Sequence, residues 1–473
     1  MLNHKISRRT FLKATAATTG ALAAVGAEGI SFDRWQKAMA AAPETVVPTI
    51  CEMCGVKCGI LAHVKDGRVV KIEGNPKHPF SSGRLCARGN AGMKTLYDPD
   101  RLRQPLKRVG ENQFVPISWD EAVKEIAGKL KELKAKYGPE TLVWACHPEL
   151  IAPWEKRFTE VFGSPNHTGH APTCFSSRSV AYNATYGNLP GVDYGNVKYY
   201  ISPGRNLIEG INNAVVQKIV AAHQNGAKLV ALDPRLSNFA AWADEWVPLR
   251  PGTDGAFLLG LMHVVIKENL YDESFVREKT VGFEELKAEM EKYTPEWAEK
   301  ITGIKAATIV RIAKEMAALR PAVAIDPAWH GGLGGMYHNG VQAGRAAACL
   351  NALMGNLGAK GGLTFGPGIK LAKEDKLPGP SLPKVNAKRW DGAGGEKWPL
   401  AKGLGLIQIL PEVVESQKPY PVKALIVSHM NPVRSCPDTG RFLAALKKLE
   451  LVVAIDIQMS DTAYHAHYIL PES

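Results

Sequence analysis

Residues 51–58 read CEMCGVKC, and residues 85–89 read LCARG. The two pieces place four cysteines in the pattern C-x2-C-x3-C-x27-C, namely Cys51, Cys54, Cys58 and Cys86. Three thiolates at short spacing can hold three corners of a small metal cluster, and a distant fourth can close it. Soft sulfur ligands favour zinc or an iron–sulfur cluster. A structural zinc site usually takes its ligands in close pairs, so this spacing favours [4Fe–4S].

The residues around these cysteines predict a small β-rich domain over residues 45–105. Two alternating stretches, 59–64 and 68–72, flank the turn residues Lys65-Asp66-Gly67. Apolar residues alternating with polar ones on either side of an Asp-Gly turn are typical of a β-hairpin. We therefore expect a hairpin directly after the third cysteine.

Further along the chain the pattern changes to apolar strands that alternate with amphipathic helices. Ser118 is placed to cap a helix that runs to Tyr137 and ends before Gly138-Pro139. This alternation indicates doubly wound, mostly parallel α/β sheets. Residues 363–400, rich in Gly, Pro and Lys, predict a long surface excursion or a connection between lobes. The predicted strands are 141–145, 197–202, 228–232, 322–325, 424–428 and 452–455, and the other predicted helices are 211–223, 256–267, 306–318, 341–357 and 440–449.

The first 42 residues are predicted to be a targeting signal and not part of the fold. Arg8 and Arg9 precede a weakly apolar run over residues 14–30 and then small residues at 38–42. This order resembles a twin-arginine export signal, with an ordinary signal peptide or a membrane anchor as alternatives. No later segment reaches about 18 uninterrupted apolar residues, so membrane attachment would need a partner subunit.

Composition limits the class of protein. The chain has 473 residues, 45% of them hydrophobic, which is enough for a large core and several domains. A net charge of +12 could suggest nucleic acid as a partner. However, the basic residues are spread along the chain and mostly stand beside Glu or Asp on predicted helices. We therefore expect a solvated basic surface and no nucleic-acid partner.

The cysteine motif and its flanking residues resemble the N-terminal domain of the dimethyl-sulfoxide-reductase superfamily. Its members hold molybdenum or tungsten between two molybdopterin guanine dinucleotides, and the resemblance extends from the signal to the last residue. Within the superfamily the chain is most similar to the catalytic subunits of thiosulfate and polysulfide reductases. The resemblance implies a pterin-binding lobe over residues 106–150 and 331–473 and a second one over 151–330. It also implies that the C-terminal barrel domain of complete relatives is missing, through truncation, a split protein or loss of function.

The resemblance implies particular roles for residues near the metal. Arg88 matches a basic residue that lies between cluster and pterin. Cys174 matches the side chain that binds molybdenum, although a lone cysteine is more often buried packing, as we expect for Cys146, Cys349 and Cys436. Histidines titrate near neutral pH and could supply protons, or could be ordinary loop histidines bonded to the backbone. The candidates are His147, His170 and His330.

Several strand ends resemble the loops that contact the two dinucleotides. Doubly wound sheets bind nucleotides at the carboxyl ends of their strands, and helix N-termini favour pyrophosphate. Each loop could equally be plain turn chemistry, but their order matches the superfamily. The family pattern usually has an acidic residue where this chain has His467. The candidate residues are Gly204, Arg205, Asn206, Asp233, Pro234, Arg235, Gly252, Thr253, Asp254, Asn351, Gly355 and Asn356 for the first dinucleotide, and Asn431, Pro432, Asp456 and Thr462 for the second.

The resemblance implies two-electron chemistry at molybdenum, with tungsten as the alternative metal. Electrons would pass through the cluster from an iron–sulfur subunit, beside a membrane anchor subunit, to a small inorganic sulfur compound. Such an enzyme would work in the periplasm or on the outer face of the cytoplasmic membrane. Alternatives are formate oxidation or the reduction of nitrate, arsenate or tetrathionate. An iron–sulfur relay subunit without molybdenum, and a zinc-stabilised nucleic-acid binder, are alternatives of other classes.

Overall fold

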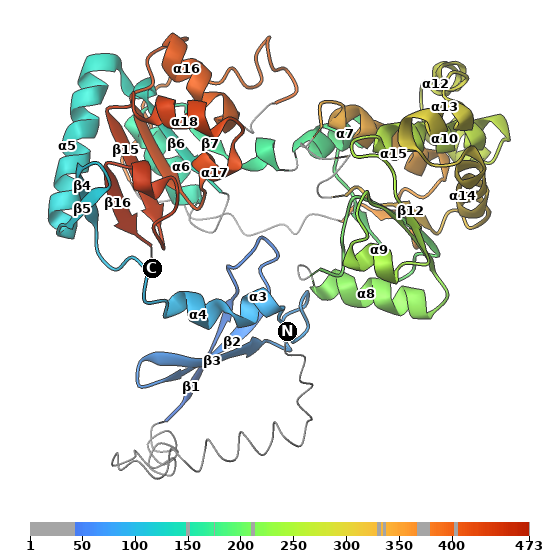
Figure 1. Ribbon diagram of the computed structural model, residues 1–473, viewed down its shortest axis with the longest axis horizontal. Helices are drawn as coiled ribbons and strands as arrows, with labels where there is room; N and C mark the ends of the chain where they lie inside the picture. The colour runs from blue at the N-terminus through green and yellow to red at the C-terminus, as the bar shows by residue number, and fades with distance from the viewer. Residues whose placement is uncertain are drawn as a thin grey trace, which may run out of the picture.

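The computed structural model describes residues 43–147, 152–174, 176–209, 213–328, 333, 337–366, 379–401 and 405–472. The predicted signal and His330 lie outside these residues. Figure 1 shows three bodies: a small N-terminal domain, a first lobe that contains the C-terminal strands, and a second lobe formed by the middle of the chain. Within these residues the strands form four sheets, and the predicted α/β class is confirmed.

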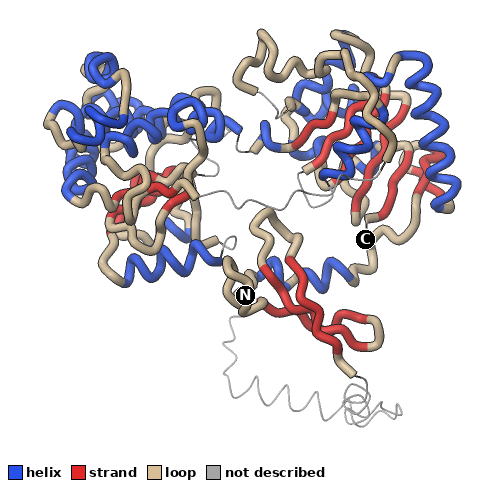
Figure 2. The backbone as a smooth tube through the Cα atoms, turned by 180° about the vertical axis from the view of Figure 1, so that it is seen from behind, coloured by secondary structure: helices blue, strands red, loops and turns tan. Residues whose placement is uncertain are grey.

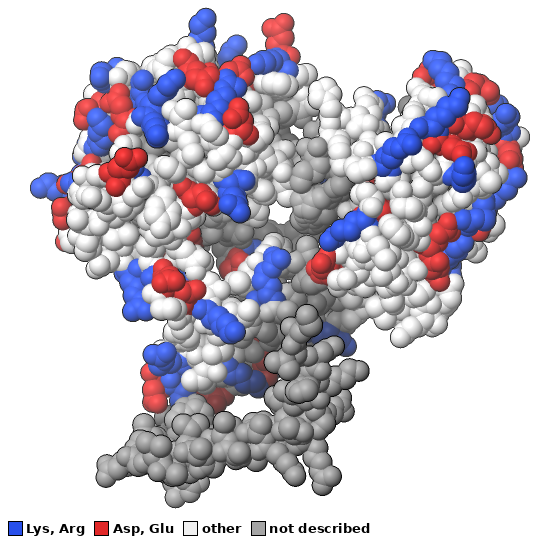
Figure 3. All heavy atoms as spheres, viewed as in Figure 1, with Lys and Arg blue, Asp and Glu red and all other residues white. Residues whose placement is uncertain are grey.

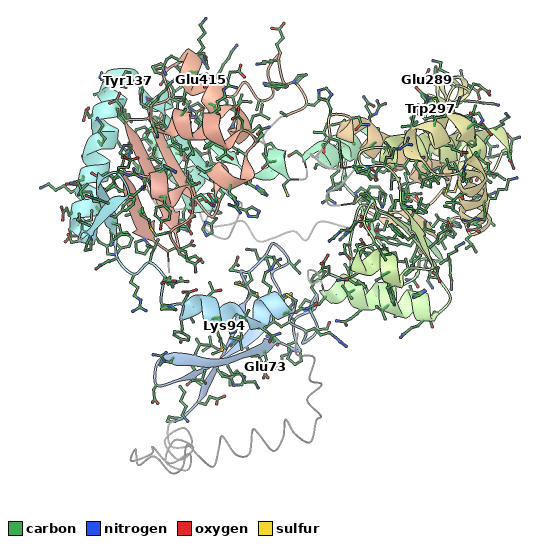
Figure 4. All side chains as sticks on the ribbon, viewed as in Figure 1. Glu73, Lys94, Tyr137, Glu289, Trp297 and Glu415 are labelled. Carbon is green, nitrogen blue, oxygen red and sulfur yellow. The ribbon has the colours of Figure 1, made fainter. Side chains whose placement is uncertain are left out.

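The N-terminal domain is an antiparallel sheet in the order β1-β2-β3, formed by Thr45–Ile50, Gly59–Lys65 and Arg68–Gly74. The predicted hairpin is confirmed. Asp66 and Gly67 have φ of 50° and 72°, as a two-residue turn between twisted strands requires. Two short helices, α3 (Ala87–Asn90) and α4 (Gly92–Leu96), pack beside the sheet. In Figure 4, Lys94 on α4 lies above Glu73 on β3.

The first lobe contains a seven-stranded sheet in the order β5-β4-β16-β15-β14-β6-β7. Strands β16 to β7 in this order are parallel, and the β4–β5 hairpin is antiparallel at one edge. The helix predicted after Ser118 is confirmed, because the Ser118 hydroxyl accepts from the Glu121 N–H at 3.1 Å. The strands are β4 (Leu106–Gly110), β5 (Gln113–Pro116), β6 (Leu142–Cys146), β7 (His167–Gly169), β14 (Ala424–Ser428), β15 (Leu451–Asp456) and β16 (Tyr468–Pro471).

Both faces of this sheet are covered, as Figure 2 shows from behind. Apolar side chains of α5 pack on one face, where Leu142, Trp144 and Ile426 lie, and Phe162 at the end of α6 joins them. Helices α16 and α18 pack on the other face, where Val143, Leu425 and Val452 lie. The bounds are α5 (Trp119–Tyr137), α6 (Ala152–Phe162), α16 (Leu410–Ser416), α17 (Pro432–Ser435) and α18 (Thr439–Leu446), with 3-10 turns η1 (Pro139–Thr141), η4 (Ile407–Ile409) and η5 (Ala463–His465).

The second lobe contains a parallel sheet in the order β11-β10-β9-β12, flanked by helices on both faces. A two-stranded ribbon, β8 with β13, lies beside it. The strands are β8 (Gly191–Val192), β9 (Tyr199–Pro203), β10 (Lys228–Leu232), β11 (Glu245–Val247), β12 (Val323–Ile325) and β13 (Leu363–Thr364). The helices are α7 (Ser176–Tyr186), α8 (Asn213–Gln224), α9 (Asn238–Trp242), α10 (Asp254–Lys267), α11 (Glu273–Lys279), α12 (Phe283–Met290), α13 (Pro295–Thr302), α14 (Ala306–Ala318) and α15 (Gly340–Leu353).

The contacts place the limits of the lobes further along the chain than residues 151 and 331, where the sequence suggested them. Strand β7 pairs with β6 in the first lobe, and α15 packs on α7 and α10 in the second. The predicted excursion also needs correction, because residues 379–401 are not all on the surface. Trp390 and Asp391 are buried, and the Asn166 amide oxygen accepts from the Trp390 N–H at 3.1 Å. This buried aromatic residue anchors the excursion to the first lobe.

The surface carries charges of both signs. On the face in Figure 3, Lys and Arg side chains are interspersed with Asp and Glu on both lobes, and the surface is hollowed between the lobes. Within the part of the chain that the structure describes, we find no helix with the length and apolar character to span a membrane.

Candidate metal centre and nucleotide-binding loops

The four predicted cluster cysteines converge in the N-terminal domain. Cys51 follows β1 and Cys58 precedes β2, and the Cys51 N–H donates to the Cys58 carbonyl at 2.8 Å. Cys86 precedes α3, where its Sγ accepts from the Gly89 N–H at 3.5 Å. A Cβ on Gly89 would lie 2.3 Å from a side-chain carbon of Leu85 and 3.4 Å from Cys51 Sγ, so the helix after the fourth cysteine lies close to the first cysteine.

The electrostatics of this group favour a cationic centre. None of the eight cysteines, which all lie among the described residues, forms a disulfide. Burial raises the pKa of Cys51 and of Cys58, and the neighbouring cysteines raise both further. Four thiolates this close would repel one another without a metal, because like charges disfavour ionisation. The residues present therefore fit a [4Fe–4S] cluster, which takes four thiolates.

Arg88, the predicted link from cluster to pterin, lies on α3 two residues after Cys86. Its side chain is exposed. Arg88 therefore lies beside the cysteine group, on the surface of the N-terminal domain.

Cys174 lies where the chain passes from the first lobe to the second. Strand β7 belongs to the first sheet, a 3-10 turn, η2 (Ala171–Thr173), follows it, and α7 begins the second lobe. The Cys174 side chain is buried, and its N–H donates to the Ala171 carbonyl at 3.0 Å. A thiol on a tight turn between two lobes is held in a defined direction, as a metal ligand needs to be.

Two of the three candidate histidines are brought together near this turn. The rings of His147, which follows β6, and His170, which precedes η2, have centroids 5.1 Å apart. The Thr173 hydroxyl donates to the His170 carbonyl at 2.9 Å, which fixes the turn ahead of Cys174.

A cavity of about 270 Å³ lies beside the Cys174 turn. Pro172, Ser176 and Val180 line it from one side, and Trp398 and Leu406 line it from the other. The hydroxyls of Ser176 and Ser177, which also line it, are buried and have no hydrogen-bond partner among the described residues. Buried polar atoms normally have a partner, so these hydroxyls leave hydrogen-bonding capacity for a polar group in the cavity.

The carboxyl edge of the second sheet gathers the predicted first-dinucleotide residues. Gly204 follows β9 with φ 62°, and its N–H donates to the Leu232 carbonyl at 2.8 Å. The Asp233 carboxylate accepts from the Arg235 N–H at 2.9 Å. Burial, together with the nearby charge of Asp233, raises the pKa of Asp254 to about 6.

The other residues of this edge have defined roles too. The Asn206 amide oxygen accepts from the Phe239 N–H at 3.0 Å, and the Thr253 hydroxyl donates to the Arg250 carbonyl at 2.6 Å. Gly252 has φ 77° and lies against the ring of Tyr337. Pro234 and Arg235 are exposed on the same loop as Asp233.

Arg205 is part of a buried network. Its guanidinium donates to Asp326 at 3.0 Å and to the Tyr194 hydroxyl at 2.6 Å, and Tyr200 also donates to Asp326 at 2.6 Å. Burial alone would lower the pKa of Arg205, but the charge of Asp326 keeps it raised. Arg205, Arg178 and Lys218 line a cavity of about 280 Å³, where an anionic group would find three cationic side chains.

Asn351 and Asn356 are fully buried, and their side chains are bonded to strand β12. The Asn351 amide bonds to both the N–H and the carbonyl of Ile325, and Asn356 donates to Asn351 and to the Val323 carbonyl at 2.7 Å. Both ends of the Asn351 amide are thus engaged within the lobe, whereas the buried Asn356 Oδ1 has no hydrogen-bond partner among the described residues. Gly355, between them, has φ 64° and ends the helical segment.

The carboxyl edge of the first sheet joins the predicted second-dinucleotide loops. The Asn431 amide oxygen, after β14, accepts from the hydroxyl of Thr462 at 2.7 Å, and Pro432 opens α17. The Asp456 carboxylate, at the end of β15, accepts from the Ile457 N–H at 2.7 Å. His467 holds β15, because its Nδ1 accepts from the Val452 N–H at 2.9 Å.

One group of side chains was not predicted from the sequence. Cys146, expected to be packing, lies with Glu155 and His167, and their ligand atoms are all within 4.8 Å of one another. Burial lowers the pKa of His167 to about 4. The only sequence signal was a cysteine at the end of a predicted strand. Cys436 and the partly buried Cys349 pack against the cores of the two lobes, as expected.

Family models match this chain over nearly its whole length. The model described as molybdopterin oxidoreductase matches residues 101–473, and the molybdopterin oxidoreductase Fe4S4 domain matches residues 44–98. A twin-arginine translocation signal sequence matches residues 5–25. The chain therefore belongs to the molybdopterin oxidoreductase family, in the dimethyl-sulfoxide-reductase superfamily, with a molybdenum–pterin cofactor and a 4Fe–4S cluster as its family cofactors.

Individual relatives agree with this family. The chain is 36% identical to the thiosulfate reductase molybdopterin-containing subunit PhsA of Salmonella typhimurium, over 99% of this chain and 63% of the relative. It is 30% identical to the arsenate respiratory reductase subunit ArrA of a Shewanella species, over 99% of this chain and 60% of the relative. The solved structure of acetylene hydratase from Pelobacter acetylenicus superposes with a TM-score of 0.72 at 29% identity, over 90% of this chain and 62% of that one. The chain thus spans about 60% of the length of the curated relatives named here.

Proposed function

We propose that this chain is the catalytic subunit of an exported molybdenum enzyme that reduces thiosulfate, polysulfide or a related sulfur compound. The observation that carries the proposal is the buried thiol of Cys174 at the passage between the two lobes, beside a cavity with unpartnered buried hydroxyls. The similarity to a thiosulfate reductase subunit supports this substrate class.

In this proposal molybdenum, held by two molybdopterin guanine dinucleotides, supplies the two-electron chemistry. Cys174 would be its protein ligand, and the carboxyl edges of the two sheets would hold the dinucleotides through residues such as Gly204, Asp233 and Asn431. Arg88, next to the cluster cysteines, would supply a positive charge between the cluster and the pterin. The cationic side chains Arg178, Arg205 and Lys218 favour a phosphate group in the cavity that they line.

Protons come from the chain itself. Reduction of thiosulfate to sulfite and sulfide breaks one S–S bond and takes up two electrons and two protons. His147 and His170, with rings in contact near Cys174, supply these protons. His330 is the third candidate and lies outside the described residues.

We also propose that the twin-arginine signal directs the chain to the periplasm or the outer face of the cytoplasmic membrane. The thiosulfate reductase relative is named as one subunit of its enzyme. By analogy, an iron–sulfur electron-transfer subunit and a membrane anchor subunit are the proposed partners here.

The test is an assay of the full chain, purified without oxygen, for thiosulfate-dependent oxidation of reduced methyl viologen. We expect iron and molybdenum in the protein, and loss of activity in Cys174→Ala with the iron content unchanged. Cys349→Ser, a thiol of the second lobe, is the matched control and should keep activity.

Activity with arsenate or formate but not thiosulfate would overturn the substrate class while leaving the enzyme class in place. Iron without molybdenum or tungsten would instead favour a relay subunit. A colourless protein that contains zinc alone would refute the cluster.

A further inference from the structure

We propose that Cys146, Glu155 and His167 bind one divalent transition-metal ion, with Zn²⁺ as the preferred ion, in the first lobe. This site uses none of the four cluster cysteines and not Cys174. It is independent of the function proposed above, because it needs neither pterin nor cluster.

The fold brings the three side chains to one face of the seven-stranded sheet. Cys146 is the last residue of β6, and His167 pairs opposite Trp144, two residues earlier on that strand, so both side chains point to the same face. Helix α6, which carries Glu155, packs on this face, where the rings of Phe158 and Trp144 are 5.2 Å apart.

The distances suit a single ion. Cys146 Sγ and His167 Nε2 are 3.3 Å apart, and a carboxylate oxygen of Glu155 lies within 4.8 Å of both. An ion bonded at about 2.0–2.3 Å to each of two atoms holds them at most about 4.6 Å apart. Rotamer adjustments of a few tenths of an ångström therefore close the site.

The burial of Glu155 is the second observation that points to a cation. Its Oε1 accepts from the Ser428 hydroxyl, but its Oε2 is buried and has no hydrogen-bond partner among the residues that the structure describes. The side chain is only 4% exposed, and His429 Nδ1 is 4.0 Å from Oε1, beyond hydrogen-bonding distance. Leaving a carboxylate buried in this way is costly. A divalent ion beside one thiolate and one carboxylate makes the group neutral.

The mixture of ligands selects the class of ion. One sulfur, one imidazole nitrogen and one carboxylate oxygen match the borderline softness of zinc, and they do not match magnesium or calcium, which prefer oxygen. Three protein ligands leave a fourth position for water. Since the ligands come from β6, α6 and β7, the ion would tie these three elements together at the carboxyl edge of the sheet.

The test is zinc and iron analysis of the full chain after dialysis against a mild chelator, with X-ray absorption at the zinc edge. We expect one zinc per chain with one sulfur at about 2.3 Å and nitrogen or oxygen at about 2.0 Å. Cys146→Ser, Glu155→Gln and His167→Asn should each lose most of the zinc while keeping the iron. Cys436→Ser, another buried thiol of the first lobe, should keep the zinc.

Three results would overturn the site: no zinc in the wild-type chain, zinc bound by several sulfurs, or zinc retained in all three ligand variants. Glu155→Gln and His167→Asn keep the side-chain shapes, so they carry the test if Cys146→Ser does not fold. If the wild-type chain contained the expected zinc but had no viologen activity, that result would count against the proposed function and not against the zinc site.

Discussion

The two lobes share a layered α/β architecture but are assembled differently. In the second lobe, all four strands of the parallel sheet come from one stretch of chain between Tyr199 and Ile325. In the first lobe, β6 pairs with β14, so that Leu142 lies opposite Ala424. The second sheet can form from contacts of moderate separation, whereas the first must close a loop that contains the whole second lobe. The first sheet therefore forms only when segments far apart in the sequence meet, while each lobe has a core of its own once folded.

We expect the largest effect from a charged side chain placed in the core of one lobe. Val427 in β14 and Val230 in β10 are both central and buried. Val427→Asp buries an unpaired charge, which costs several kcal/mol. We expect hydrogen exchange to show loss of protection in the first lobe with β9 and β10 still protected, and the reverse pattern for Val230→Asp. Equal loss in both lobes from either variant would show that the cores unfold as one.

Two buried asparagine side chains, one in each lobe, allow a second test of the two lobes with a smaller expected effect. Asn166 donates to the Glu140 carbonyl at 2.7 Å and accepts from the Trp390 N–H and the Tyr420 hydroxyl at 3.1 Å each. Asn351 bonds to β12 in the same manner. Each Asn→Ala variant leaves buried backbone groups without partners, so we expect losses of about 3 kcal/mol in the free energy of unfolding. Exchange should increase at residues 389–391 only for N166A and at β12 only for N351A.

Asp254→Asn should stabilise the second lobe. Burial raises the pKa of Asp254 to about 6, above its unfolded value of about 3.9, so the folded state holds the proton longer. Stability therefore falls as pH rises from about 4 to about 6, by about 2–3 kcal/mol. The variant should lack this fall and be more stable by that amount at pH 7, as measured by urea unfolding. If Asp254→Asn had the same pH dependence of stability as the wild-type chain, the raised pKa of Asp254 would not be the cause of the fall.

The smallest effect concerns His467 in the first lobe. Burial lowers its pKa, with help from Arg108 and Lys129, and the neutral ring accepts from Val452. As pH falls below about 6.5, the unfolded state gains a proton that the folded state resists, so stability falls. His467→Asn keeps an acceptor near the Nδ1 position and should flatten the acid side of the urea-unfolding profile, by less than Asp254→Asn flattens its own.

The local sequence pattern predicted several helices and strands correctly. Strands β10 and β14 and helix α14 have the predicted bounds. The helix predicted over 341–357 ends instead at Leu353, because Gly355 takes a left-handed conformation and Asn356 turns back to β12. Strand β7 is three residues long and was not predicted, since so short a segment carries no periodicity.

The cysteine motif, the alternation of strands and helices, and the loops that follow the strands could be predicted from the amino-acid sequence, because they depend on residue type and on spacing within a few residues. Other features became visible only in the folded chain: β14 lies between β15 and β6, Trp390 anchors a distant segment, and Cys146, Glu155 and His167 meet. Such meetings depend on which apolar faces bury each other, and that choice is made by the whole chain at once.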